Sequence, residues 1–476
     1  MKDTNQKLKA ALANIEKTYD DSIIPTLSEY IKIPNKSIMF DKDWKAHGYM
    51  DQAMQLIVDW CKKQTIQDMQ LELIEAEGRT PLLLIDIPGQ SDETVLLYGH
   101  MDKQPEMRGW DEDKGPWEPI IQDGKLYGRG GADDGYSTFA ALTAIKTLQE
   151  NDIPHARCVL IIEASEESGS VDLIYYLEQL KDRINTPSLI IALDSGAGNY
   201  EQFWSTTSLR GVVGGDLEIR VLNHGMHSGL ASGIVPSVFL VLHNILNRIE
   251  DRRTGCINID TLNVAIPSER IEQAQHTANA LGTTLLGAYD LTDSTQPVNN
   301  DNTELLLNRT WRPSLSITGI TGIPSAENAG NVTLPRITFK LSVRIPPTLD
   351  VEVAQNTLKE FFESNTPFNA KVTYTPHETG QGWNAPALED WLKAANENAS
   401  QLFFGKPSAY FGEGGSIPFM GMLGDMFPKA QFLITGVLGP LSNAHGPNEF
   451  LHIDYVKRIT GCVASVLASH YSHFSS

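Results

Sequence analysis

Two histidines and several carboxylates of this sequence stand in short, glycine-rich segments where they could bind metal ions. The segments are GHMD at 99–102, GRGGADDG at 128–135, EESGS at 166–170, ALDSG at 192–196 and NAHGPNE at 443–449. Imidazole and carboxylate are the ligands of Zn²⁺, Mn²⁺ or Co²⁺ when thiolates are absent. A bridging carboxylate can hold two ions close enough to act as a pair. These residue types therefore point to metal-assisted chemistry.

Short apolar runs precede most of these segments and would position them. The runs span 71–74, 81–87, 94–98, 158–163, 189–194 and 431–436. Their length and their content of Leu, Ile and Val predict buried strands of a mostly parallel sheet. In an open α/β sheet, ligands bind at the carboxyl ends of the strands. The side chains expected to converge on that edge are His100, Asp133, Glu166, Glu167 and Asp194, and the run 431–436 leads towards His445.

Each of these residues, taken alone, has an ordinary structural explanation. A single histidine at a strand end, or one Asp-Gly turn, stabilises local structure more often than it binds a ligand. Several of them at the strand ends of one sheet make the metal hypothesis the stronger one. The sequence contains none of the patterns G-x-S-x-G, G-x-x-x-x-G-K-[ST], G-x-G-x-x-G and H-E-x-x-H, so other familiar catalytic signatures are absent.

The alternation of strands and helices predicts the fold class. Helical periodicity lies between the apolar runs, over 44–63, 136–149 and 171–181, which is typical of an α/β layer fold. From about residue 206 the pattern changes to strands with mixed faces and separate helices. Those elements span 209–222, 235–250, 334–345 and 351–364, and the α/β pattern returns with helices over 388–402 and 453–468.

We therefore predict an α/β fold in which a mostly parallel-sheet domain is interrupted by a smaller α+β domain. The larger domain would comprise 1–205 and 385–476, and the inserted domain would comprise 206–384. The polar stretch 268–310 is expected to hold loops. The histidines near the C-terminus, His452, His470 and His473, are expected on the surface.

Composition and charge exclude several classes of function. The 476 residues include 38 Lys and Arg against 59 Asp and Glu, a net charge of −21, with no basic run to bind nucleic acid or an anionic membrane. No apolar run approaches the roughly 18 residues of a membrane-spanning helix. The four cysteines form no C-x-x-C pair, and the N-terminus lacks the apolar core of a signal peptide. We expect a soluble, cytoplasmic protein.

The five ordered segments resemble those of the M20 metallopeptidases. This family comprises di-metal dipeptidases of the carnosinase type, carboxypeptidases and N-acyl amino-acid deacylases. LLYGHMDKQPE resembles its H-x-D segment, GRGGADDG its metal-bridging Asp segment, EASEESGS its double-Glu segment, ALDSG its Asp segment and NAHGPNE its closing His segment. The resemblance covers essentially the whole chain. It departs at Lys103-Gln104-Pro105, where many members have Val-Val-Pro, a change outside the ligands that could alter the pocket wall.

The resemblance implies two divalent cations per subunit, with Zn²⁺ as the first candidate and Mn²⁺ or Co²⁺ as alternatives. By motif, His100 and Asp194 would bind one ion, Glu167 and His445 the other, and Asp133 would bridge both.

The resemblance also implies roles for two carboxylates beside these ligands. Asp102 would orient the imidazole two residues before it. Glu166 would be the general base, which accepts a proton from the attacking water and gives it to the leaving amine. The peptide bond between Asp133 and Asp134 is expected to be cis, as is typical of the family.

The inserted domain resembles the family's lid and dimerisation domain. Its segment NHGMHSG at 223–229 matches the pattern that carries a histidine into the neighbouring subunit's site. We assign that role, an oxyanion donor, to His227, with His224 as the less favoured alternative. A homodimer is therefore expected.

Four further residues match substrate-binding positions of the family. Arg344 would hold the terminal carboxylate of the substrate, although a surface arginine explains it equally well on sequence alone. Asn331 matches a polar contact from the partner chain, with an uncertain register. Gly415 and Ser416 resemble a loop that binds substrate by a backbone N–H group and a hydroxyl.

The leading functional hypothesis is metal-dependent hydrolysis of amide bonds in dipeptides or short peptides, by a metal-bridged water with Glu166 as general base. The alternative is an N-acyl amino-acid amidohydrolase with the same di-metal site. A third reading, a non-catalytic binding protein, is disfavoured because Glu166 and all five ligand positions are present.

Overall fold

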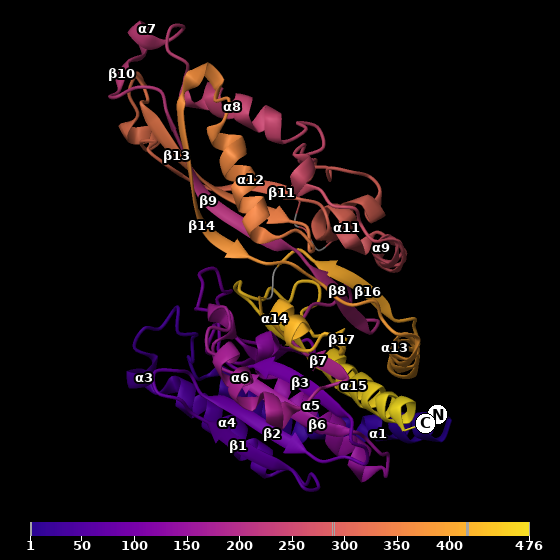
Figure 1. The fold of residues 1–476 in the computed structure, drawn as a ribbon. Helices are drawn as coiled ribbons and strands as arrows, with labels where there is room; N and C mark the ends of the chain where they lie inside the picture. Colours follow the sequence, from indigo (N-terminus) through magenta and orange to yellow (C-terminus); the bar gives the residue numbers. More distant parts are fainter. Residues whose placement is uncertain (1, 288, 290, 416–417, 476) are drawn as a thin grey trace.

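The computed structural model describes residues 2–287, 289, 291–415 and 418–475, and it has two lobes (Figure 1). The larger lobe is built on a central sheet. Its strands, in spatial order, are β1 (Gln70–Ile74), β2 (Leu82–Ile87), β6 (Arg157–Glu163), β3 (Thr94–His100), β7 (Leu189–Ala192), β17 (Gln431–Ile434), β8 (Trp204–Leu209) and β15 (Trp383–Asn384), and β16 (Ala409–Glu413) pairs with β8.

The middle of this sheet is parallel and its edges are antiparallel. Strands β6, β3, β7 and β17 run in parallel, β16 runs parallel to β8, and the remaining neighbours pair antiparallel. The predicted α/β fold with a mainly parallel sheet is confirmed. The parallel centre matters for function, because it brings the carboxyl ends of β6, β3, β7 and β17 to one edge.

Helices cover both faces of the central sheet. Successive residues of β3 alternate between two cores, with Val95 and Leu97 in one and Leu96 and Tyr98 in the other. The first core is completed by α1 (Lys2–Thr18), α2 (Ile24–Ile31), α4 (Tyr49–Lys62), α5 (Ser137–Glu150), α13 (Asp390–Phe403) and α15 (Ile453–Phe474), and the second by α6 (Leu173–Ile184) and α14 (Pro418–Met426). Among the described helices, none combines the length and apolar content needed to cross a membrane.

Two small features flank this lobe. The short helix α3 (Trp44–His47) precedes α4. A small antiparallel sheet holds β4 (Ile120–Gln122), β5 (Lys125–Tyr127) and β18 (Phe450–His452), so the segment before Asp133 and the segment after His445 are joined by backbone pairing.

The smaller lobe is built on a separate antiparallel sheet, here called the lid sheet. Its order is β11 (Ser314–Thr321), β13 (Arg336–Ile345), β9 (Gly211–Arg220) and β14 (Lys371–Gly380), and helices α8 (Val238–Ile249) and α12 (Val351–Glu363) pack on it. Ser237 and Asp350 cap the two helices by accepting hydrogen bonds from the backbone N–H groups of Leu240 and Val353. The lid tip consists of β10 (Met226–His227), α7 (Ser228–Ala231) and β12 (Val332–Thr333).

The prediction of loops over 268–310 is wrong, because this stretch contains helices. They are α9 (Ser268–Leu281), α10 (Thr284–Gly287) and α11 (Asn302–Thr310). Their few apolar side chains, Ala274, Ala278, Leu281, Leu306 and Leu307 among them, join the first core of the main lobe. A Cβ atom on Gly412 of β16 would lie 2.8 Å from Cβ of Thr310, so α11 packs directly on that strand. Tertiary contact, rather than a wide apolar stripe, makes this polar sequence helical.

The chain crosses from the central sheet to the lid sheet at Arg210, between β8 and β9, and returns between β14 and β15. Arg210 secures this crossing, because its guanidinium Nη1 donates to the carbonyl oxygens of Asn308 and Arg312 at 3.3 and 3.1 Å. We propose that the division into 1–205 with 385–476 and 206–384 follows this crossing.

Of the three histidines expected on the surface, His470 is buried and His452 is half-buried, whereas His473 is exposed. His470 Nε2 lies 2.9 Å from Ser188 Oγ, and its ring packs against Trp391 and Phe474. The prediction fails here because α15 is covered over almost its whole length, which the helical period of its own sequence does not reveal. Burial, followed by the nearby His473, lowers the pKa of His470 to about 4.

This shift predicts a pH-dependent stability. Between pH 6.5 and 4 the unfolded chain binds a proton at His470, whereas the folded chain does not. As the pH falls through this range, the free energy of unfolding should therefore decrease by up to about 3 kcal/mol. His470→Gln should remove that part of the pH dependence. The free energy of unfolding of variant and wild type is measured by chemical denaturation at several pH values, in the presence of a chelator, and the two are compared. Exposed His473→Gln is the matched control. A His470→Gln difference that stays constant with pH would contradict the assignment.

Candidate metal centre

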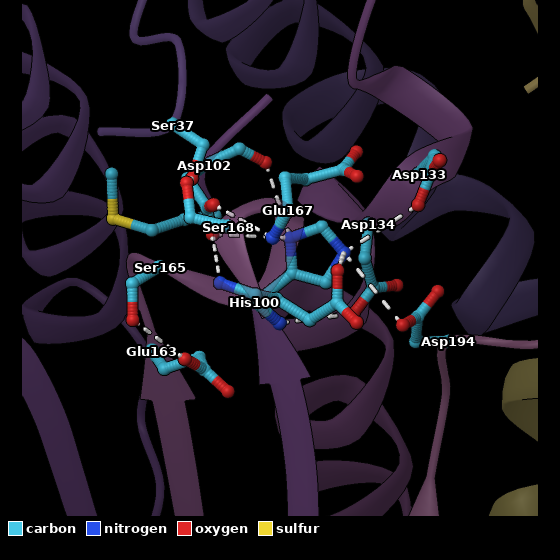
Figure 2. A network of polar contacts seen from close by, with 12 residues as sticks. Ser37, His100, Asp102, Asp133, Asp134, Glu163, Ser165, Glu167, Ser168 and Asp194 are labelled. Atoms are coloured by element: carbon cyan, nitrogen blue, oxygen red, sulfur yellow. Dashed lines mark hydrogen bonds and ion pairs between the residues drawn. The ribbon is translucent and has the colours of Figure 1, made fainter. Parts of the chain in front are cut away.

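His100 lies at the carboxyl end of β3, fully buried, with carboxylates around its ring (Figure 2). Its Nε2 atom lies 3.4 Å from Asp133 Oδ1, 3.7 Å from Asp194 Oδ2 and 4.0 Å from Glu166 Oε2. Asp194 arrives beside it because β7 pairs in parallel with β3. Within the described chain Nε2 has no hydrogen-bond partner, so it is available as a metal ligand.

The tautomer of His100 follows from its other nitrogen. Nδ1 lies 3.1 Å from the carbonyl oxygen of Asp102, and a carbonyl can only accept. Nδ1 therefore carries the proton, and the Nε2 lone pair faces Asp133 and Asp194.

A second group of ligand atoms adjoins the first. His445 Nε2 lies 3.0 Å from Asp133 Oδ2 and 3.3 Å from Glu167 Oε2. Glu167 Oε1 is buried without a hydrogen-bond partner in the described part of the chain. The atoms offered by His100, Asp133 and Asp194 lie within 4.8 Å of one another, as do those of Asp133, Glu167 and His445. Asp133 belongs to both groups, so the geometry fits two cations that share one carboxylate.

The turn that carries Asp133 is held closely against β3. The peptide bond between Asp133 and Asp134 is cis, as the resemblance implies. Asp134 is buried, and its Oδ2 atom accepts a hydrogen bond of 3.1 Å from the backbone N–H group of His100. The side chains of the two adjacent aspartates therefore have different partners. Asp133 belongs to the ligand groups, whereas Asp134 binds the backbone of β3.

The negative charge of this centre also favours the binding of cations. Five carboxylates gather here with two imidazoles, and within the described residues no lysine or arginine forms an ion pair with Asp133, Asp194, Glu166 or Glu167. Burial, with the neighbouring carboxylates, raises the pKa of Glu166 and Glu167 well above the usual range and that of Asp194 to about 7. Divalent ions would relieve this repulsion, and the donor set of imidazole and carboxylate suits them.

Asp133 behaves differently from the other carboxylates. Burial favours its neutral form, but the neighbouring imidazoles of His100 and His445 hold the pKa of Asp133 below its usual range. Of the three ligand carboxylates, the one that both groups share is therefore the most readily ionised.

Asp102 organises the backbone behind the ligands. Its Oδ1 and Oδ2 atoms accept hydrogen bonds from the backbone N–H groups of Glu166 and Glu167, each at 3.0 Å, and Oδ1 lies 3.4 Å from His100 Nδ1. It is fully buried. One carboxylate thus aligns the imidazole from β3 and the double-Glu turn after β6.

Several supporting residues escape sequence reasoning. Gln104 donates from Nε2 to Glu167 Oε2 at 2.6 Å, and the buried Lys103 donates from Nζ to the carbonyl oxygens of Tyr30 and Ile33 at 2.7 and 2.8 Å, at the end of α2. The departure from Val-Val-Pro therefore reaches a ligand residue and a helix end. The sequence showed that Lys103 and Gln104 are polar where many family members have valine, but it did not show which residues they contact.

A buried ion pair joins the two loops of the second ligand group. Arg129 Nη1 lies 2.6 Å from Glu449 Oε2, and both side chains are at most 1% exposed. Glu449 Oε1 also accepts from the backbone N–H group of Gly130 at 2.9 Å, while Arg129 Nη2 donates to the carbonyl oxygen of Gly446 at 2.6 Å. Both residues stand inside the motif segments, yet only the fold shows that they pair.

Glu413 does the same for the segment after Asp194. Its Oε1 atom accepts hydrogen bonds from Ser195 Oγ at 2.8 Å and from the backbone N–H group of Gly196 at 2.7 Å. A residue at the end of β16 thereby holds the turn that carries a ligand at the end of β7.

The residues predicted in the insert lie elsewhere. His227 and Asn331 sit together at the lid tip, where the backbone N–H group of Ser228 donates to the carbonyl oxygen of Asn331 at 2.8 Å. Both residues are exposed, and β10 and α7 lie at the end of the lid farthest from the central sheet (Figure 1). Within one chain they are not brought to the metal centre.

The other predicted substrate residues lie nearer the junction of the lobes. Arg344 is half-buried on β13, opposite Val212, which stands one residue from the start of β9. Gly415 is exposed in the loop after β16. Ser416 lies outside the described residues.

The architecture and this centre together are those of a metallopeptidase, and the sequence comparison makes the assignment specific. Residues 96–469 match the peptidase family M20/M25/M40, so the chain belongs to that family. The predicted family is confirmed, and so is the predicted class of enzyme, because its curated relatives include metallodipeptidases.

The relatives are similar over most of their length. The Cysteinylglycine-S-conjugate dipeptidase of Corynebacterium striatum is 28% identical and aligns with 79% of this chain and 81% of its own. The Beta-Ala-His dipeptidase of Homo sapiens is 28% identical over 90% and 86%. Among solved structures, a di-peptidase from Saccharomyces cerevisiae has a TM-score of 0.72 at 21% identity and covers 98% of both chains. Human carnosine dipeptidase 1 has a TM-score of 0.72 at 22% identity, covering 97% and 99%.

The contacts of Asp102 generate a prediction. Asp102→Asn would turn an N–H donor towards a backbone N–H group that now donates to a carboxylate oxygen. We expect the affinity for Zn²⁺ to fall by about 10- to 100-fold, as for other residues that support metal ligands. Competition with a chromophoric chelator measures this, and Asp113→Asn, at an exposed carboxylate, is the control. Unchanged affinity in Asp102→Asn would contradict the supporting role.

Proposed function

We propose that this protein is a metal-dependent dipeptidase that hydrolyses the amide bond of dipeptides or short peptides. The observation that carries the proposal is the pair of ligand groups sharing Asp133. The family match supports the class of reaction, and the relatives that are named dipeptidases support the substrate class.

In this proposal the centre holds two divalent cations, with Zn²⁺ as the first candidate and Mn²⁺ or Co²⁺ as alternatives. His100 and Asp194 would hold one, Glu167 and His445 the other, and Asp133 both. When bound, such ions polarise a scissile carbonyl and lower the pKa of water.

Glu166 is the proposed general base. Its carboxylate faces the centre, 4.0 Å from His100 Nε2, but belongs to neither ligand group. Asp102 anchors its backbone N–H group, so the side chain is aimed by a fixed turn. Glu166 would take the proton of the attacking water and deliver it to the leaving amine.

The lid would complete the site in a homodimer. The tip that carries His227 and Asn331 exposes apolar side chains that one chain leaves uncovered. They are Met226, Leu230, Ile234 and Val332, with Leu230 at 70% and Ile234 at 83% exposure. A second chain packed on this tip would bury them and could carry His227 to the partner's centre as an oxyanion donor.

The remaining proposed contacts belong to the substrate. Arg344 would bind the terminal carboxylate, and the loop with Gly415 and Ser416 would contact the backbone of the peptide. We also propose a cytoplasmic location, which the free cysteines Cys61, Cys158, Cys256 and Cys462 support. An N-acyl amino-acid amidohydrolase would use the same centre, but the named dipeptidase relatives favour the peptidase.

A substrate screen tests the reaction and its base together. The Zn²⁺- or Mn²⁺-loaded protein should consume dipeptides from a pool of dipeptides, tripeptides and N-acyl amino acids, followed by mass spectrometry, and a chelator should stop it. Glu166→Gln should lower kcat by about 10²- to 10⁴-fold with two ions still bound. Glu178→Gln on α6, at an exposed carboxylate, is the control. Loss of only N-acyl amino acids would make the protein a deacylase, and loss of metal from Glu166→Gln would contradict the base.

Subunit mixing tests the role of the lid tip. His227→Ala should lower kcat without changing bound metal, whereas His224→Ala, at a neighbouring exposed histidine, should not. Equal mixing of His227→Ala with Glu166→Gln should restore about a quarter of the wild-type activity, because half the dimers would then hold one complete site. No recovery, after subunit exchange has been demonstrated by mass, would contradict action across the interface.

A further inference from the structure

A cleft of about 390 Å³ lies beside the metal centre and has no role in the mechanism above. We call it the Arg309 cleft. One wall comes from residues 196–198, which begin two residues after Asp194, and from residues 438–441, which end four residues before His445. The facing wall comes from α9 to α11 and from β16. The cleft is therefore built by the same loops that carry two of the ligand residues.

Four side chains of the facing wall are apolar. They are Leu281, Leu285, Leu306 and Phe411. These side chains would pack against methylene groups and would not satisfy a polar stem. The apolar part of the cleft thus suits an aliphatic chain, and one end of the cleft is charged.

Arg309 supplies that charged end. Its guanidinium lies 5.7 Å from the centre of the Phe411 ring, and Nη1 donates to Tyr289 OH at 3.2 Å. Across the described residues Arg309 makes no ion pair, and its buried Nε atom has no hydrogen-bond partner. The chain has 59 acidic side chains against 38 basic ones, so an arginine without an acidic partner is unusual. A buried guanidinium N–H group without an acceptor also costs free energy.

The other charged groups that the structure describes at the cleft leave Arg309 available. Glu413 also lines it, but its Oε1 atom already accepts hydrogen bonds from Ser195 and Gly196, and it forms no ion pair with Arg309. Two further arginines lie close behind. Burial, then the positive charges of Arg344 and Arg309, lowers the pKa of Arg210 to about 10. Three guanidinium groups therefore lie near one another at this end of the cleft.

Building on the dipeptidase function above, we propose that the Arg309 cleft is a side-chain subsite that selects an acidic side chain on a short aliphatic stem, such as glutamate. The apolar wall would cover the methylene groups, and the guanidinium would bind the carboxylate through charge-assisted hydrogen bonds. A neutral side chain of the same shape would leave the guanidinium unpaired and would be disfavoured.

The test compares substrates that differ only in this charge. For the Zn²⁺-loaded protein, kcat/KM is measured for Glu-Ala against Gln-Ala and for Ala-Glu against Ala-Gln. We expect one of the two pairs to favour the acidic member by about 10-fold or more. The order that shows the preference identifies which residue of the dipeptide enters the cleft.

Arg309→Gln should bring the preferred ratio to near one. Because each ratio is taken within one variant, a general loss of activity cancels. Arg312→Gln is the matched control, since Arg312 is also half-buried, two residues after the end of α11, but pairs with Glu304 and does not line the cleft. Arg309→Glu should invert the preference towards Lys-Ala or Ala-Lys. Equal ratios in the wild type, or a ratio that Arg309→Gln leaves unchanged, would overturn the subsite.

Failure of the subsite is distinguishable from failure of the proposed function. If the loaded protein hydrolyses no dipeptide at all, the dipeptidase proposal fails, and binding of Glu-Ala and Gln-Ala is then measured by calorimetry. Tighter binding of Glu-Ala that Arg309→Gln abolishes would still support the acidic subsite. Equal binding would overturn it. If dipeptides are cleaved without charge preference, the function stands and the subsite does not.

Discussion

The structure depends on one electrostatic constraint, the collection of carboxylates at the carboxyl edge of a parallel sheet. Strands β3, β6 and β7 end side by side and deliver His100, Glu166, Glu167 and Asp194 into a buried space. Such a cluster repels itself unless cations or protons neutralise it, and burial removes the water that would screen it. Among the ligand carboxylates, Asp133 is the one whose pKa the two neighbouring imidazoles hold low, and it is the residue common to both ligand groups.

Much of the surrounding fold serves to hold these groups against their repulsion. Asp102 ties the turn after β6 to the end of β3, and the Arg129–Glu449 pair ties the Asp133 turn to the His445 loop. The latter pair is fully buried, so its geometry is set by several hydrogen bonds and not by charge alone. Arg129 and Glu449 are therefore as much a part of the centre as the ligands that they position.

The lid carries predicted functional residues that lie outside the central sheet. Its sheet packs on its own helices, yet its tip exposes apolar side chains next to His227, and one chain leaves this histidine far from the centre. The helices of the polar stretch 268–310 instead pack on the main lobe, where they form one wall of the Arg309 cleft. A segment without an obvious pattern thus becomes the part of the chain that could tune substrate choice.

The sequence by itself determined the alternation of strands and helices, the mainly parallel sheet and the strand-end segments that meet at its edge. It did so because strand burial and turn chemistry are local properties that leave a period and a spacing. It did not reveal that α9 and α11 are helices, that His470 is buried, or that Gln104 bonds to Glu167. Nor did it pair Arg129 with Glu449, which stand 320 positions apart. Only the tertiary structure decided these, because each depends on which distant surface packs against a residue, and a one-dimensional pattern carries no record of that contact.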